Sequence, residues 1–212
     1  MAPSDRLPSH PDLTVESDER VWSGRFPLDR VRFRHRRFDG QLTRVKTWEL
    51  WRRGAAAALL PYDPIRDAVL LIEQFRLPAL AANFDPVVVE IPAGLCDAGE
   101  SAEQTIRREL REELGMDADL LQRIGRFILT AGGSDENCTM FVGRVHAPDP
   151  RPDGVVGHAG MQDEDEDIRI RMWQADAAIA AALEGRFSNS VTVIALLWLN
   201  ARRDALRREW TK

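Results

Sequence analysis

The chain has 212 residues, of which 44% are hydrophobic and 30% charged, as expected for a soluble globular protein with one good core. No run of about 18 apolar residues occurs, which argues against a membrane-spanning helix. The N-terminal segment also lacks the apolar stretch of a signal peptide, and the two cysteines show no disulfide framework or metal-ligand spacing. We therefore expect a cytoplasmic protein with no membrane partner and a flexible lead-in over residues 1–19.

The net charge of −5 is unevenly distributed along the chain. Between Arg20 and Arg53, eleven arginines and lysines accompany only three acids, whereas residues 163–167 are five consecutive acids. A basic segment of this kind can bind nucleic acid or an anionic small molecule, or it can be a solvated pair of strands. We favour solvated strands for most of these arginines and expect no nucleic-acid partner. A steep salt dependence of DNA or RNA affinity would contradict that expectation.

Two hairpins are predicted in the first third of the chain. Residues 31–51 alternate roughly between apolar and polar side chains, and Asp39-Gly40 supplies a two-residue turn. Residues 55–75 form the second predicted hairpin. Its turn is marked by Pro61, Asp63 and Pro64.

A strand over residues 87–91 and a helix from about Ser101 to Leu114 follow. The helix has an apolar residue at every fourth position, which can face a sheet, and Gly115 is suited to end it. Further strands are predicted over 120–129, 137–146 and 167–173, and two closing helices over 175–187 and 190–210.

These elements predict an α+β fold, a mixed sheet flanked by helices, rather than a strict βαβ repeat. A small N-terminal antiparallel sheet over residues 20–52 would precede the main domain over residues 53–212. The glycine-rich segment 157–160 is interpreted as part of a long loop, such as a lid.

The predicted helix carries three glutamates at positions that share one face, Glu109, Glu112 and Glu113. Each like-charged pair costs about 0.2–0.5 kcal/mol in water, and a bound cation would remove that cost. A surface helix stabilised by ion pairs is the alternative, since Glu103 and Arg107 stand four residues apart. Ion pairs alone, however, would not require glycines at fixed distances on either side of the helix.

The segment resembles the Nudix box, the signature of hydrolases that cleave nucleoside diphosphates linked to another group. The matching positions are Gly94, Glu100, Arg108, Glu109, Leu110, Glu112, Glu113, Gly115 and Met116. From about Arg32 to Trp210 the chain is similar to bacterial ADP-ribose pyrophosphatases, through FRHRRFDGQ, LLPYDPIRDAVLLIEQFR, AGGSDE, DEDEDIRI and NSVTVIALLWL. The resemblance implies a Nudix α/β/α sandwich and a homodimer built by the N-terminal sheet.

The resemblance also implies a role for individual residues. The metal ligands would be Glu109, Glu113, Glu166 and the carbonyl of Ala93, holding Mg²⁺ or Mn²⁺ through hard oxygen atoms. Glu164 would be the catalytic base, with the choice among the acids of residues 163–167 left open. Glu112, also counted as catalytic, would ligate the metal directly or through water. The implied substrate contacts are Phe26, Trp48, Arg53, Arg76, Leu95, Gly133 and Glu136.

The implied reaction is hydrolysis of ADP-ribose to AMP and ribose 5-phosphate. One position departs from the pattern, because Ala131 stands where these enzymes usually carry a proline. Another nucleoside diphosphate sugar, such as GDP-mannose, is therefore the alternative substrate. A Nudix-fold sensor that binds ADP-ribose without cleaving it is the alternative from another class, although such a protein would be expected to lack box carboxylates.

Overall fold

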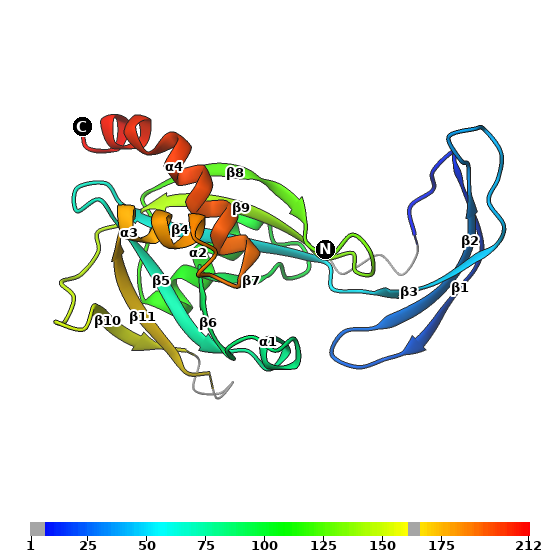
Figure 1. Ribbon diagram of the computed structural model, residues 1–212, viewed down its shortest axis with the longest axis horizontal. Coiled ribbons are helices and arrows are strands. Elements are labelled where there is room, and N and C mark those ends of the chain that lie inside the picture. The colour runs from blue at the N-terminus through cyan, green and yellow to red at the C-terminus, as the bar shows by residue number, and fades with distance from the viewer. Residues whose placement is uncertain (1–6, 161–165) are drawn as a thin grey trace.

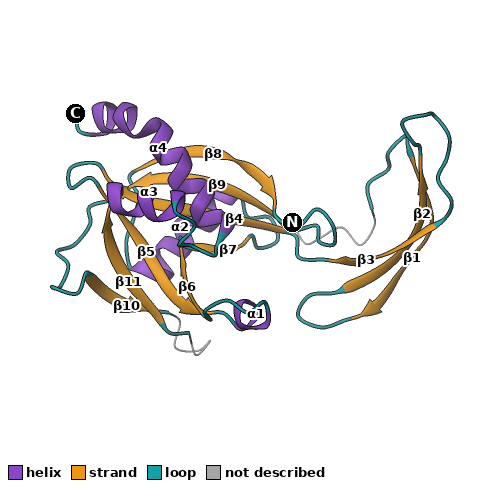
Figure 2. Cartoon of the chain, viewed as in Figure 1, coloured by secondary structure: helices purple, strands orange, loops and turns teal. Residues whose placement is uncertain are grey.

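The computed structural model describes residues 7–160 and 166–212. These residues form an eight-stranded mixed sheet with helices on both faces and a separate three-stranded antiparallel sheet, which lies to one side of the main body (Figure 1). Figure 2 shows the same arrangement by element type. The predicted α+β class, with a mixed sheet and a small N-terminal sheet, is confirmed. None of the helices formed by the described residues has the length and apolarity needed to cross a membrane.

The N-terminal sheet begins earlier than the sequence pattern indicates. Its strands are β1 (Leu13–Trp22), β2 (Leu28–His35) and β3 (Lys46–Trp51). Residues 13–19 were expected to belong to a flexible lead-in, but they pair with β2 in an antiparallel ladder whose register shifts between Val15 and Ser17. The alternation over LTVESDERVW is obscured because almost every side chain of β1 is exposed, so neither face carries a continuous apolar row.

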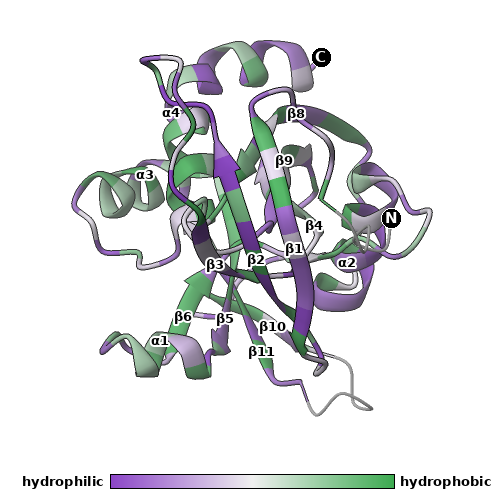
Figure 3. Cartoon of the chain, turned by 90° about the vertical axis from the view of Figure 1, so that its right-hand side faces the viewer, coloured by the Kyte–Doolittle hydropathy of each residue, from purple (hydrophilic) through white to green (hydrophobic). Residues whose placement is uncertain are grey.

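The turn at Asp39-Gly40 is present but is not a two-residue hairpin loop. Gly40 has φ of +82° and its amide donates to the carbonyl of Arg37, yet β2 and β3 are separated by residues 36–45. Figure 3 views the molecule from the side of this sheet, where hydrophilic and hydrophobic residues both occur along β1 and β2. The basic side chains are largely paired; Arg34, for example, contacts Glu16 at 2.8 Å.

The main sheet has the strand order β10 (Val155–Ala159), β11 (Ile168–Gln174), β5 (Ala68–Phe75), β4 (Ala55–Asp63), β9 (Asn137–Arg144) and β8 (Leu120–Ile128). β4 runs parallel to β9 and antiparallel to β5. Strands β4 and β5 pair only around Tyr62 and Val69 and then diverge. The fork is filled by β6 (Val87–Glu90), which pairs with β5, and β7 (Ala93–Leu95), which pairs with β4.

Strand β4 is buried on both faces and organises both halves of the core. Its even-numbered residues from Ala56 to Tyr62 face one cluster, together with Met140 and Leu196, whereas Ala57 and Leu59 face the other. Because successive side chains of a strand point to opposite faces, the continuous apolar run AAAALL serves both layers. Pro61, expected in the turn, lies inside β4, and the turn follows at residues 64–67.

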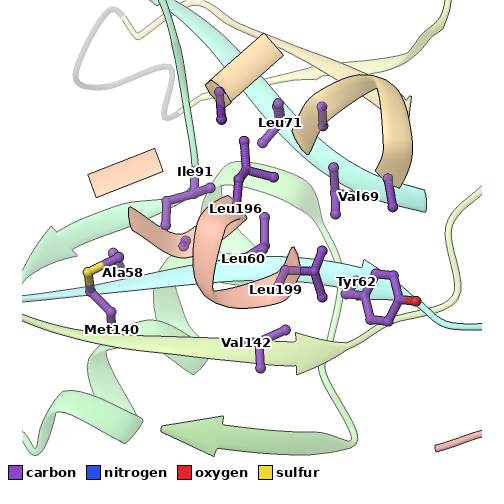
Figure 4. Close-up of a cluster of buried hydrophobic side chains, with 14 of the residues drawn as sticks. Ala58, Leu60, Tyr62, Val69, Leu71, Ile91, Met140, Val142, Leu196 and Leu199 are labelled. Carbon is purple, nitrogen blue, oxygen red and sulfur yellow. The ribbon is translucent and has the colours of Figure 1, made fainter. Parts of the chain in front are cut away.

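Helices cover the two faces of the sheet. On one face lie α3 (Ala175–Leu183) and α4 (Ser190–Trp210), whose Leu196 and Leu199 pack on Leu60 (Figure 4). On the other face lies α2 (Ala102–Leu114), with Ile106, Leu110 and Leu114 buried. The remaining helix, α1 (Leu77–Ala81), is a single short turn that the sequence did not indicate.

The glycine-rich segment is also more regular than expected. Gly157–Ala159, interpreted as part of a long loop, belongs to β10 and pairs with β11. Glycine weakens the strand pattern in sequence, but Gly157 lies in the edge strand against Ile170 at an ordinary distance.

A buried polar cluster ties the β4–β5 turn to α4. Asp67, with φ of +53°, accepts hydrogen bonds from the hydroxyl of Tyr62 at 2.7 Å and from Arg203 Nε at 2.8 Å. Burial raises the pKa of Asp67, but the hydrogen bonds from Arg203 and Tyr62 outweigh it and hold the pKa below its ordinary value. Burial and the same hydrogen bond raise the pKa of Tyr62. The cluster fixes α4 across the sheet.

Candidate active site

Helix α2 starts and stops at residues suited to those positions. Ser101 Oγ accepts from the Gln104 amide while Gln104 Oε1 accepts from the Ser101 amide, which completes a capping box. Gly115 has φ of +65° and ends the helix. With its apolar side on the sheet, α2 turns Glu109 and Glu113 toward the β6–β7 segment, and Glu113 is only 5% exposed.

Gly94 allows the glutamates to approach the backbone. A Cβ atom at this position would lie 1.8 Å from Glu109 Oε1. Since real Cβ contacts never come that close, any other residue would displace the Glu109 carboxylate. The glycine at the start of the box is therefore required by the position of Glu109, not by its own backbone dihedral angles.

Glu113 is an acid in an unfavourable environment. Burial raises its pKa to about 9, and the charges of Glu109 and Glu166 contribute, while Arg76 and a backbone hydrogen bond from Ala93 act in the opposite direction. Its Oε2 atom is buried and has no hydrogen-bond partner among the described residues. A buried oxygen without a partner is costly, so this atom is available for a ligand.

Glu109 shares this environment. Burial raises its pKa, and Glu112 and Glu166 add to the effect, although Arg108 counteracts it. Arg108 Nη1 contacts Glu109 Oε1 at 2.7 Å and Glu112 Oε2 at 2.9 Å. Arg108 thus supplies part of the positive charge that the carboxylates require.

Arg108 is held in turn by Glu100. Its Nη2 and Nε atoms contact the two oxygens of Glu100 at 3.1 and 3.2 Å. The hydrogen bonds from Arg108 lower the pKa of Glu100 to about 2. Thr105 Oγ1 donates to Glu100 at 2.9 Å and fixes the carboxylate at the start of α2. Glu100 and Arg108 therefore orient the site.

Glu166 reaches the site from the segment that enters β11. Gln74 Nε2 donates to Glu166 Oε1 at 2.6 Å, and Gln74 pairs across the sheet with Ile168. The charge of Glu166 acts on both Glu109 and Glu113. The three acids predicted as metal ligands therefore lie within electrostatic reach of one another.

These residues fit a divalent cation by their chemistry. Mg²⁺ and Mn²⁺ prefer oxygen ligands, and Glu113 Oε2 is a buried oxygen without a partner in the described part of the chain. Within residues 7–160 and 166–212, no three acidic, histidine or cysteine side chains already lie close enough to hold an ion. The carboxylates repel one another in this arrangement, and an ion would draw them together.

A cleft of about 680 Å³ opens beside the acids. It contains side chains of both charges and two apolar ones. The lining residues are Arg25, Glu73, Gln74, Phe75, Arg76, Val87, His158, Glu166, Asp167 and Arg169. The predicted diphosphate contact Arg76 thus lies in the same cleft as Glu166. Its guanidinium suits a diphosphate, since it can bind two oxygens at once.

The two aromatic residues predicted to bind the base, Phe26 and Trp48, pack against different partners. Phe26 packs edge-on against Trp51, with ring centroids 5.9 Å apart, and Arg53 lies over the Phe26 ring at 4.2 Å. Arg53 also contacts Glu136 at 2.9 Å. Trp48, by contrast, lies against Phe33. The structure therefore groups three predicted contacts, Phe26, Arg53 and Glu136, and adds Trp51 to them.

The predicted backbone contacts lie next to residues of the acidic cluster and of the aromatic group. The Leu95 carbonyl accepts from Arg108 Nη2 at 3.3 Å, and Ala93 donates to Glu113. The Gly133 carbonyl accepts from the Trp51 amide at 2.8 Å, which joins the turn containing Ala131 to the end of β3. Glu164, the predicted base, lies outside the described residues.

The sequence pattern does not single out Gln74, Glu90 and Trp51. Gln74 and Glu90 lie at or near the ends of the apolar strands AVLLIEQF and VVVE, and a polar residue in a buried strand is the signal that could identify them. Trp51 could not be separated from Trp48 by sequence, because both lie in the same short strand.

The fold and the carboxylate-bearing helix define a class of metal-dependent hydrolases, and a family comparison agrees. The NUDIX domain matches residues 51–192, and the chain belongs to this family. It is 39% identical over 199 residues to the ADP-ribose pyrophosphatase of Escherichia coli K12, covering 94% of this chain and 93% of that protein. The corresponding Haemophilus influenzae protein is 31% identical, with 96% and 93% covered. The predicted resemblance is confirmed.

Two other proteins are similar to the chain to a lesser extent. The GDP-mannose pyrophosphatase of Yersinia enterocolitica is 35% identical over 149 residues, which covers 70% of this chain and 74% of that protein. A solved structure described as an ADP compounds hydrolase has a TM-score of 0.67 over 96% of this chain and 98% of its own, at 21% identity. That structure supports the fold.

Proposed function

We propose that the protein is a metal-dependent pyrophosphohydrolase that cleaves ADP-ribose to AMP and ribose 5-phosphate. The observation that carries the proposal is the buried, unpartnered Oε2 atom of Glu113, beside Glu109 and Glu166 and next to a cleft containing Arg76. Similarity over almost the entire length to ADP-ribose pyrophosphatases supports this substrate.

Each group of residues has a defined part in this reaction. Glu109, Glu113, Glu166 and the Ala93 carbonyl would hold Mg²⁺ or Mn²⁺, which neutralises the diphosphate and makes a bound water more acidic. Glu164 would accept the proton of the attacking water, a contribution of about 10²–10⁴-fold, with Glu112 as the second candidate. Arg76 would bind the diphosphate oxygens, while Leu95 and Gly133 offer backbone contacts.

The opposite end of the substrate would meet the aromatic group. Phe26 and Trp51, with Trp48 as the residue expected from the sequence, offer flat apolar surfaces for a base. Arg53 and Glu136 would contact the ribose and phosphate. The paired state of Arg53 with Phe26 and Glu136 keeps its guanidinium oriented before substrate binds.

We further propose that residues 20–52, together with the preceding strand β1, form a dimerisation sheet attached to a hydrolase domain over residues 53–212. Exposed aromatic residues support this surface: Trp22 is 63% exposed and Trp48 51%. The protein would act in the cytoplasm as a homodimer on a small-molecule substrate, without a nucleic-acid or membrane partner.

The test is product analysis with Mg²⁺ on ADP-ribose, GDP-mannose, NADH and ADP-glucose, with Glu113→Gln as the inactive control. Faster release of AMP from ADP-ribose than from the other compounds is expected. Preference for GDP-mannose would keep the mechanism but change the substrate, and would point to the turn at Ala131. Cleavage of none of the four would overturn the enzymatic proposal in favour of a sensor.

A further inference from the structure

Arg76 is held by a buried carboxylate behind it. Its Nε atom contacts Glu90 Oε2 at 2.7 Å, and Glu90, the last residue of β6, is 8% exposed. The second oxygen of Glu90 accepts from Asn189 Nδ2 at 2.6 Å. One carboxylate therefore joins the end of β5, the end of β6 and the start of α4.

The orientation of the Asn189 amide is fixed by helix α4. Asn189 is the N-cap residue, and its Oδ1 atom accepts from the Thr192 amide at 2.9 Å and from Thr192 Oγ1 at 3.2 Å. Because Oδ1 faces the helix, Nδ2 must face Glu90. Glu90 consequently accepts on both oxygens, a role that a glutamine could not fill.

The first turn of α4 is also hydrogen-bonded to Ile91, the residue that follows β6. Thr192 Oγ1 accepts from the Ile91 amide at 3.0 Å, and Thr192 is fully buried. Glu90 and Ile91 are thus both bound to the first turn of α4. These hydrogen bonds give a structural role to the segment NSVTV, which is part of the sequence that resembles the family.

We propose that Glu90 and Asn189 are positioning residues that orient Arg76 toward the diphosphate of the substrate. With Nε bound to Glu90, the terminal nitrogens of Arg76 have no hydrogen-bond acceptor among the described residues, and Arg76 lines the cleft. An arginine whose rotamer is already fixed loses less conformational freedom on binding. This inference rests on the proposed function, because it assigns Arg76 to the diphosphate.

Asn189→Asp separates this role from helix capping. Aspartate is as good an N-cap as asparagine, so the hydrogen bond to the Thr192 amide survives, but an oxygen replaces the donor that faces Glu90. We expect KM for ADP-ribose to rise about tenfold with a smaller change in kcat. The dissociation constant measured by calorimetry in EDTA, where no turnover occurs, should rise by a similar factor. Asn200→Asp, the same change at an exposed position of α4, is the matched control and should have no effect.

Exchanging the carboxylate and the amide between positions 90 and 189, and measuring affinity for ADP-ribose, is the decisive test. Glu90→Gln alone should weaken binding about as much as Asn189→Asp, because an amide NH₂ group then faces another donor. In the double variant Glu90→Gln/Asn189→Asp, the amide introduced at position 90 donates to the carboxylate introduced at position 189. The oxygen of that amide accepts from Arg76 Nε. We expect affinity to return to within about threefold of the wild type, which a mere loss of stability could not produce.

Arg76→Met tests whether the pair acts through Arg76. In that background, Asn189→Asp should cause no further loss of affinity. Three results would each overturn the inference. They are a further tenfold loss of affinity in the Arg76→Met background, unchanged binding in both single variants, or a double variant whose loss of affinity equals the product of the two single losses. Absence of ADP-ribose turnover by the wild type would instead overturn the proposed function and, with it, the role assigned to Arg76.

Discussion

The carboxylate of Glu113 is buried beside two other acids, and its Oε2 atom has no partner among the described residues. A folded-state pKa of about 9 lies well above the value near 4.3 of a free glutamate. The folded, metal-free protein therefore binds this proton more tightly than the unfolded chain. The contribution of Glu113 to stability falls as pH rises from about 4.3 toward 9, because the unfolded chain releases this proton while the folded protein retains it.

Glu113→Gln should accordingly stabilise the metal-free protein at pH 8 and inactivate it. We expect the free energy of unfolding in EDTA to rise by about 1–3 kcal/mol. Turnover should fall about 10³-fold or more, since several kcal/mol of transition-state stabilisation are lost. Urea denaturation and initial rates measure the two effects.

Glu103→Gln is the control for that experiment, because Glu103 lies exposed on the same helix in a pair with Arg107. Its activity should match that of the wild type. Glu164→Gln should retain more activity than Glu113→Gln. Comparable turnover of Glu113→Gln and wild type would refute the assignment of Glu113 as a metal ligand.

Gly94→Ala tests the close approach of Glu109. The added methyl group would occupy the position of the Glu109 carboxylate, so we expect kcat/KM to fall at least tenfold. Gly157→Ala introduces the same methyl group 3.6 Å from Ile170, an ordinary contact, and should keep its activity. Equal activity of the two variants would show that Glu109 can move without loss.

At the scale of elements, the box is stabilised by the contact between Glu100 at the start of α2 and Arg108 in its middle. The pKa of Glu100 is lowered to about 2, so its contribution to stability is complete above its unfolded value of about 4.3. The contribution is lost as pH falls through 2. The pH dependence of the Glu100 contribution to stability is therefore opposite in sign to that of the Glu113 contribution.

We expect Glu100→Gln to destabilise the protein by about 1–2 kcal/mol at pH 6, the magnitude of a partly exposed charged hydrogen bond. The difference from the wild type should shrink steadily between pH 4.3 and 2. Urea denaturation of both proteins across this range measures it. A difference that stays constant down to pH 2 would mean that the Glu100 charge does not stabilise the fold.

Elements with a strong periodic pattern and clear end signals could be predicted from sequence. Helix α4 matches the prediction to the residue, and α2 begins one residue after the predicted Ser101, which is its N-cap. Strands β1 and β10 could not be predicted, because one is exposed along its length and the other contains glycine. Of the site, the helix acids follow from spacing, whereas the contacts of Gln74 with Glu166 and of Glu90 with Asn189 arise only from the tertiary fold.

At the scale of the whole molecule, the N-terminal sheet has few contacts with the main body. Trp51 bridges to Ser134, and the buried Arg52 contacts both Asp29 and Asp135. Further large apolar side chains are exposed in and around α1, among them Phe75, Leu77 and Phe84. Exposed apolar side chains of this kind support the proposed homodimer.

The proposed homodimer should appear in analytical ultracentrifugation as a species of about twice 24.0 kDa. Trp48→Glu should shift the equilibrium toward the monomer, because it replaces an exposed aromatic side chain of the N-terminal sheet with a charge. Ile65→Glu, at an exposed position in the β4–β5 turn, should leave the mass unchanged. A wild-type monomer at micromolar concentration would refute the dimer.

The parallel pairing of β4 with β9 has a consequence for how the chain is made. Ala55 pairs with Asn137, which leaves the ribosome about 80 residues later. At about 5–20 residues per second, the partner strand emerges roughly 4–16 s after β4. During that interval one edge of the most apolar strand has no neighbour, and an unpaired apolar edge is a template for association with other chains. Yield in a cell should therefore depend on translation rate and chaperone supply more than on the stability of the finished fold.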